Sequence, residues 1–290
     1  MFLPRPANRG ARTLALATVL LLAALAAPAA AQTKKNAPAP PPQPAPDTAQ
    51  LYEQCMTLAR QRPDLAFTQA VQWRNRGGGL PAEHCEGLAL LNLRQYEEAA
   101  KRFHDVAEGS TMASVQLRIE AYDNAAQAWM LANQPKNAKA EFDAALKLDP
   151  KNVDLLIGRG QASGLGGDYW AALDDLNAAL DIDPKRADAL VLRAASYRRV
   201  KAEDLAMDDV NRAITIDPEF PDAYVERGIL MAIKGDYDAA KRDWTKVIQM
   251  APDTFLAEQA KRNLQELEKL KNRPATAPQD NSKKAPPKTK

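Results

Sequence analysis

The sequence predicts an all-α protein of stacked helix pairs, an α-α superhelix, on the basis of three observations. Proline recurs at a constant interval, at Pro150, Pro184, Pro218 and Pro252. A similar phrase precedes each proline, for example Leu-Lys-Leu-Asp and Leu-Asp-Ile-Asp. Aromatic residues make up only 6% of the chain and alanine is abundant, which suits close helix packing better than β-sheets. A fixed period over four units is typical of repeats that stack on their neighbours.

The segment 1–31 has the pattern of a secretory signal peptide. Three arginines precede the apolar stretch Leu14–Ala26, and the small residues Ala29–Ala31 fit a cleavage site. Cleavage there starts the mature chain at Gln32 and leaves it without an integral membrane segment. The alternative is a retained membrane anchor, because the uncharged stretch is nearly long enough to span a bilayer. In both cases we expect the body outside the cytoplasm, periplasmic or secreted, because the positive residues stay inside.

The two ends of the remaining chain have no apolar period. Residues 32–47 form a proline-rich linker and residues 273–290 a basic tail. We expect the linker to be an extended spacer that cannot pack, and the tail to be disordered. The lysines of the tail either aid solubility or contact anionic surfaces of the envelope. The whole chain has 39 Lys and Arg against 37 Asp and Glu, but the body between these ends is net acidic. An acidic body argues against nucleic-acid binding.

Residues 48–118 are predicted to hold two irregular helix pairs, because apolar residues recur there at helical spacing without the proline period. Pro63 separates the first two helices, and Gly77–Gly79 ends the first pair. Extra residues follow the second pair before the regular period begins. The four expected helices are Thr48–Gln61, Asp64–Arg74, Pro81–Leu93 and Gln95–Glu108.

Four regular units follow, at 119–152, 153–186, 187–220 and 221–254. In each unit a small residue on the first helix is expected to face a large apolar residue on the second, so that the two helices approach closely. The small residues are Ala126, Gly160, Ala194 and Gly228, and the large ones are Phe142, Leu176, Val210 and Trp244. Residues 255–272 form a charged last helix, which we expect to cap the final apolar face.

The period and the small–large spacing resemble the tetratricopeptide repeat (TPR) family, specifically over 119–254 and more weakly over 48–118. The chain differs at Arg159, Arg193 and Arg227, where the family usually has leucine. The resemblance implies a TPR solenoid of about six helix pairs plus the capping helix. It also implies an inner groove, lined by the first helix of each pair, that binds a protein or peptide partner.

The resemblance carries a set of groove candidates, with Leu165, Ala195 and Arg199 in the wider lining. The candidates are Asn124, Gln127, Met130, Ile157, Gln161, Val191, Leu192, Arg198, Val225, Glu226 and Ile229. Some TPR proteins clamp a peptide carboxylate in this groove, but Asp123 and Asp188 stand where basic residues would be needed. The apolar candidates suit an apolar partner segment instead. The alternative is that several of them pack against neighbouring helices.

Charged residues also follow the period. Arg159, Arg193 and Arg227 alternate with acids on the second helices, namely Glu141, Asp175, Asp209 and Asp243. We expect a ladder between repeats, in which each arginine pairs with the acid of the preceding unit, as in Asp175–Arg193, and Asp243 pairs with Lys261. The alternative pairs each arginine with the acid that follows it in its own unit.

A row of acids begins the first helices, at Glu120, Asp154, Asp188 and Asp222. Such a row suits either a basic partner or the positive end of each helix dipole.

Cys55 and Cys85 are the only cysteines, on the first helices of neighbouring pairs. An even count outside the cytoplasm favours a disulfide, with two buried thiols as the alternative.

No residue pattern points to an enzyme, a cofactor or a metal site, because His84 and His104 are the only histidines and no nucleophile or phosphate-binding motif occurs. The sequence therefore predicts a protein-interaction scaffold or adaptor that holds a peptide segment or subunit in the groove, outside the cytoplasm. The alternative is an accessory structural subunit of a cell-envelope assembly that binds through its edges or outer face.

Overall fold

A computed structural model describes residues 47–109 and 115–271 of the chain. The predicted signal peptide and basic tail lie outside these residues, as does the linker apart from its last residue, Asp47.

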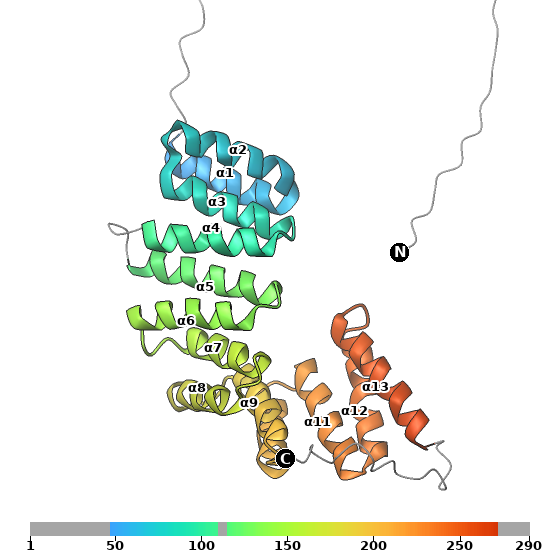
Figure 1. Ribbon diagram of the computed structural model, residues 1–290. Helices are drawn as coiled ribbons and strands as arrows, with labels where there is room; N and C mark the ends of the chain where they lie inside the picture. Colours follow the sequence, from blue (N-terminus) through green and yellow to red (C-terminus); the bar gives the residue numbers. More distant parts are fainter. Residues whose placement is uncertain (1–46, 110–114, 272–290) are drawn as a thin grey trace, which may run out of the picture. The chain divides into compact units, whose positions relative to one another are not determined.

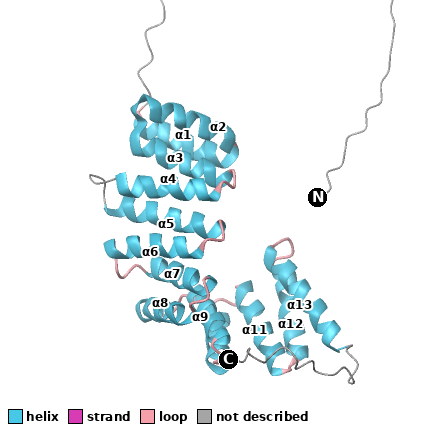
Figure 2. Ribbon diagram, in the orientation of Figure 1, coloured by secondary structure: helices cyan, strands magenta, loops and turns pink. Residues whose placement is uncertain are grey.

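The described residues form thirteen α-helices and no strand, in six consecutive pairs followed by a single last helix (Figures 1 and 2). This confirms the all-α class and the stacked pairs. The helices are α1 (Thr48–Gln61), α2 (Pro63–Trp73), α3 (Gly79–Asn92), α4 (Tyr96–Gly109), α5 (Val115–Leu131), α6 (Pro135–Leu148), α7 (Val153–Leu165), α8 (Tyr169–Ile182), α9 (Ala187–Arg199), α10 (Glu203–Ile216), α11 (Pro221–Lys234), α12 (Tyr237–Met250) and α13 (Phe255–Lys271). A kinked turn, Arg74–Gly78, joins α2 to α3, with Gly77 at a positive φ of 91°. Helix α5 starts ahead of residue 119, where its unit was expected to begin.

Phe142, Leu176, Val210 and Trp244 are all buried, and the ring of Phe142 also meets Gly158 of the next repeat. The expected small–large contact inside a pair is seen at Gly160, where an added Cβ would lie 3.0 Å from Leu176 Cγ. It is seen again at Gly228, where an added Cβ would overlap the indole ring of Trp244. Only glycine leaves room for that ring, so the largest side chain of the series faces the smallest.

The periodic arginines bind within their own repeat, so the expected ladder is wrong in its pairing. Arg193 donates from Nε and Nη2 to the two carboxylate oxygens of Asp209, on the second helix of the same pair, at 2.7 and 2.8 Å. Arg159 with Asp175 and Arg227 with Asp243 repeat the arrangement. The other expected partner of Asp243, Lys261, contacts Glu258 instead. The planar guanidinium fork matches a carboxylate, which explains the preference for a two-point contact with one acid.

The third nitrogen of each arginine still links neighbouring repeats, through a residue that was not foreseen. Nη1 of Arg193 donates to Asn177 Oδ1 on the preceding second helix at 2.8 Å. The equivalent contacts join Arg159 to Asp143 at 2.8 Å and Arg227 to Asn211 at 3.4 Å. Each arginine therefore ties three helices together.

Near the N-terminus the residues that bridge neighbouring pairs are of other types. Glu86 stands at the arginine position and lies 3.2 Å from Arg102, on the second helix of its own pair, and 2.5 Å from Arg74 of the preceding pair. In the next repeat Ala125 takes the arginine position, and Glu141 reaches back to His104 at 3.0 Å. A polar bridge between pairs is thus kept while its residue types change.

The disulfide between Cys55 and Cys85 is present, with the two Cα atoms 6.2 Å apart. It joins α1 to α3 and bypasses α2, so it links the first helices of two successive pairs. This confirms the disulfide and excludes the alternative of two buried thiols.

Replacing Arg193 by leucine should lower the free energy of unfolding by about 3 kcal/mol, because the buried carboxylate of Asp209 loses its partner. Arg212 remains 3.6 Å from that carboxylate and is too exposed to replace the lost contact. The double substitution Arg193→Leu/Asp209→Leu should recover most of the loss, since both charges are gone. Urea unfolding of the three proteins measures the cycle. Equal destabilisation of the single and double variants would contradict the pairing.

Stability should depend on pH through His104. The hydrogen bond to Glu141 raises the pKa of His104 above 6.5. Because the pKa of His104 is higher in the folded state than in the unfolded state, its protonation stabilises the fold. This stabilisation is complete below pH 6.5, the unfolded pKa, and is lost as the pH rises through the folded pKa. The difference in melting temperature between wild type and His104→Gln should therefore be larger at pH ~6 than at pH ~8.5. The effect should be small because the side chain is half-exposed, and a difference that does not change with pH would exclude it.

Closing the loop between Cys55 and Cys85 should stabilise the N-terminal pairs by about 3–4 kcal/mol. Thiol titration of the unfolded, unreduced protein should find no free thiol. Cys55→Ser/Cys85→Ser should make hydrogen exchange faster in α1–α4 and leave α9–α12 unchanged, because each pair contacts only its neighbours. A uniform change over all helices would contradict this local effect.

Candidate functional site

The first helices of successive pairs share one face of the stack. Helix α9 contacts both α7 and α11 directly, in addition to its own partner α10. We call the surface of α5, α7, α9 and α11 that carries the predicted groove residues the first-helix face. The residues on it differ from repeat to repeat, so this face can distinguish one binding partner from another.

Four of the groove candidates lie in the core of the free chain. Ile157, Val191 and Val225 are buried in the hydrophobic core, and Glu226 is buried beside them. Their side chains pack in the core, as expected under the alternative that several groove candidates pack against neighbouring helices. The more accessible candidates are Asn124, Gln127, Met130, Gln161, Leu192, Arg198 and Ile229.

Asn124 is already engaged in a polar link across three repeats. Its Nδ2 lies 3.3 Å from Nε2 of His84, whose Nδ1 lies 2.9 Å from the hydroxyl of Tyr52. Burial lowers the pKa of His84, so the imidazole is neutral at neutral pH. Asn124 therefore joins α1, α3 and α5.

The acidic row is only partly as predicted. Asp154, Asp188 and Asp222 lie in the first turns of α7, α9 and α11, whereas Glu120 lies beyond the first turn of α5, which begins at Val115. Arg186 donates to Asp154 at 2.6 Å and to Asp188 at 2.7 Å. Asp154 and Asp188 therefore offer less charge to a basic partner than the sequence suggested.

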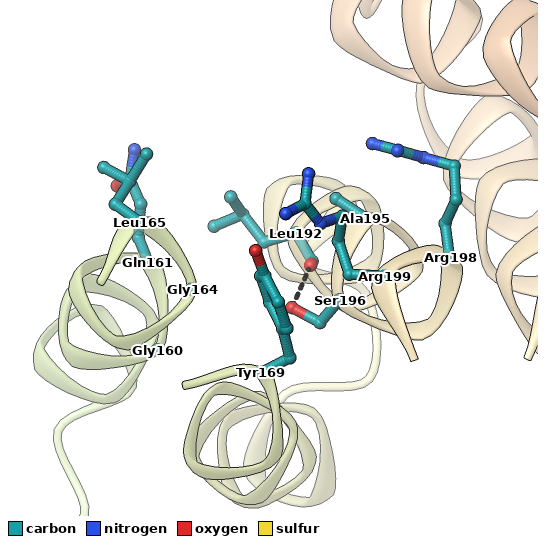
Figure 3. A pocket seen from close by; sticks show the side chains of 10 residues that line it. All are labelled: Gly160, Gln161, Gly164, Leu165, Tyr169, Leu192, Ala195, Ser196, Arg198 and Arg199. Atoms are coloured by element: carbon teal, nitrogen blue, oxygen red, sulfur yellow. Dashed lines mark hydrogen bonds between the residues drawn. The ribbon is translucent and has the colours of Figure 1, made fainter. Parts of the chain in front are cut away.

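The first-helix face is hollowed between α7, α8 and α9 by a pocket of about 430 Å³ (Figure 3). Its lining is Gly160, Gln161, Gly164, Leu165, Tyr169, Leu192, Ala195, Ser196, Arg198 and Arg199. Gln161, Leu192 and Arg198 are groove candidates, and Leu165, Ala195 and Arg199 belong to the wider predicted lining. Tyr169 and Ser196 were missed. Tyr169 starts a second helix, and the repeat register gave no sign that it would reach the first-helix face.

The pocket exists because Gly164 has no side chain. The equivalent positions in the neighbouring repeats carry Met130 and Arg198. An added Cβ at Gly164 would lie 3.7 Å from Ala172 Cβ and 3.9 Å from Ser196 Oγ, at ordinary contact distances. A side chain would therefore fit at this position and would occupy the space between the helices.

The two arginines of the pocket are held differently. Arg198 forms an ion pair with Glu226 of α11, with Nη2 3.1 Å from Oε2. The guanidinium of Arg199 lies over the Tyr169 ring, 4.9 Å from its centre. Arg198 thus joins two first helices, whereas Arg199 is exposed at the pocket.

A shallower hollow of about 700 Å³ runs along α10. The polar groups in its wall include Arg193 and Asp209, which already bind each other, so it offers less unused binding capacity. In the described ranges no helix is long and apolar enough to cross a membrane. Nor do those ranges bring three His, Cys, Asp or Glu side chains together as a metal site.

The TPR family model matches residues 119–152, the first regular unit. A TPR protein from Parabacteroides merdae is 17% identical, with 76% of this chain and 84% of that chain covered and a TM-score of 0.59. The crystal structure of MamA is 20% identical, covering 61% and 96%, with a TM-score of 0.48. YrrB, described as a TPR protein with an unusual peptide-binding site, is 24% identical, covering 68% and 98%, with a TM-score of 0.46.

A comparison with curated proteins found no match. The likeness to the Parabacteroides merdae protein shows the fold, and the family match falls on the unit that opens the regular period. The period of that unit continues through three further helix pairs with small and large residues at the same positions. The chain therefore has the fold of a tetratricopeptide repeat solenoid, and its first regular unit matches that family's model.

Proposed function

We propose that this protein is an interaction scaffold that binds a segment of a partner protein on its first-helix face. The observation that carries the proposal is the pocket between α7, α8 and α9. Its volume falls within the range of roughly 300–1,000 Å³ that is usual for binding pockets. An open pocket on a rigid helical stack suits a side chain of a partner segment, with no chemical step required.

The lining of the pocket fits such an anchor. Leu165 is 65% exposed, and with Leu192 and Ala195 it offers apolar surface that is in contact with water in the free chain. Burying an apolar side chain of a partner there removes water from both surfaces, at about 25 cal/mol per Å². Gln161 is exposed and supplies an amide for hydrogen bonds to a bound segment, whereas the Ser196 hydroxyl is buried and donates to the Leu192 carbonyl oxygen at 3.0 Å.

We also propose that the protein acts outside the cytoplasm. The disulfide between Cys55 and Cys85 supports this location, because disulfides persist in oxidising compartments and are rare in the cytosol. The predicted signal peptide points to the same location.

A second candidate function is the accessory structural subunit that binds through its edges or outer helices. Trp170, in the first turn of α8, favours it, because the side chain is 69% exposed and large exposed aromatic residues are enriched at protein interfaces. A photo-crosslinking residue placed at Leu165 or at Trp170 separates the two functions. Adducts at Leu165 support the pocket, and adducts only at Trp170 support the outer surface.

Replacing Leu165 by glutamate should weaken binding of peptides selected from a random phage-displayed library by about 10- to 100-fold, because an apolar anchor becomes charged. Gly164→Met should also block these peptides, since it adds to the pocket the side chain that Met130 carries in the preceding repeat. It should raise helix stability as well, because glycine is a poor helix former. Fluorescence anisotropy with labelled peptides measures both effects on binding, and thermal unfolding measures the gain in stability.

Leu131→Glu is the matched control. Leu131 has the same position in the preceding repeat and is 56% exposed, but it does not line the pocket. It should leave peptide binding unchanged. Equal loss in Leu131→Glu and Leu165→Glu, or full binding by Gly164→Met, would exclude the pocket as the binding site.

A further inference from the structure

The arginines of the first-helix face differ in whether the chain supplies them with an acid. Arg159, Arg193 and Arg227 each hold an aspartate of their own repeat. Arg186 holds Asp154 and Asp188, and Arg198 holds Glu226. These pairs fix the register of the stack and leave their carboxylates occupied.

Arg199 is different. Within residues 47–109 and 115–271 no acidic side chain forms an ion pair with it, and its guanidinium rests on the Tyr169 ring. Figure 3 shows the Arg199 side chain on the same side of the pocket as Leu192 and Tyr169. A full positive charge therefore stands at the pocket beside apolar walls.

Stacking on an aromatic face prepares a guanidinium for recognition. The contact holds the planar group by one face and leaves its N–H edges free to donate. Two parallel hydrogen bonds to a carboxylate are the strongest use of such an edge. The apolar walls formed by Leu165 and Leu192 exclude water around a bound segment, which strengthens the attraction between opposite charges.

We propose that the partner segment presents an aspartate or glutamate side chain beside an aliphatic residue, with Arg199 binding the carboxylate and Leu165 and Leu192 receiving the aliphatic group. The inference rests on the proposed function, because it assigns partner chemistry to the same pocket. Two observations carry it: within the described residues Arg199 has no acidic partner, and apolar surface lies next to it in the pocket.

The test is selection from the random peptide library on the purified protein, followed by affinity measurements with synthetic peptides. Wild type should enrich peptides with Asp or Glu beside Leu, Ile or Val. Arg199→Gln should weaken their binding by about 10- to 100-fold, the effect of losing a hydrogen-bonded charge. It should also flatten the salt dependence of the affinity. The affinity of Arg199→Lys should lie between those of wild type and Arg199→Gln, since lysine keeps the charge but cannot make the two-point contact.

Arg60→Gln is the control, because it removes the same charge from an exposed position on α1 and should leave binding unchanged. Arg199→Glu should change the selection toward basic peptides. Enriched peptides that depend on Leu165 but lack an acid, or that bind Arg199→Gln as tightly as wild type, would overturn this inference and leave the proposed pocket standing. Selection of no peptide that depends on Leu165 would overturn both.

Discussion

The structure depends on close packing between small residues on the first helices and large apolar residues on the second helices. At Gly228 the indole of Trp244 fills the space that a side chain would take, and at Gly160 an added Cβ would lie 3.0 Å from Leu176 Cγ. The small residues let the helices approach closely and the large ones fill the space between them, so the pairs stack in register. The remaining positions of each first helix are then free to vary.

The charged bridge between pairs is secondary to this packing. The residues that form it differ from repeat to repeat, so the fold does not require one fixed set of charges. Arg159 and Asp175 appear with their charges reversed as Glu86 and Arg102. An alanine at position 125 lets Glu141 bind the preceding pair through His104. What persists is an ion pair between two helices, since an unpaired buried charge is costly. Charge alone therefore does not identify the repeat positions of α1–α4, which explains why these pairs resembled the family weakly.

The sequence predicted the helix pairs, their number and the disulfide, because periodicity and cysteine count depend on local spacing. It failed where the contact partner of a side chain depends on the distances between helices. Repeat register placed Arg193 near both Asp175 and Asp209 but did not say which carboxylate its fork would meet. Ile157, Val191 and Val225 were assigned to the groove from their position along the helix, although their side chains are buried in the hydrophobic core. Tyr169 reaches the pocket from a second helix, and no periodic rule describes an opening created by a missing side chain.

The disulfide gives the stack two unequal ends. In a chain whose units contact only their neighbours, loss of structure starts at a terminus and moves inward one pair at a time. Cys55 and Cys85 fasten α1 to α3 covalently, so the first pair is not released on its own. At the other end α13 is held by non-covalent contacts, namely packing against α12 and α11 and an ion pair between Lys241 and Glu268. Thermal fraying, and a force applied along the chain, should therefore proceed from α13 toward the middle, which leaves the pocket between α7 and α9 several helices away from the end that opens first.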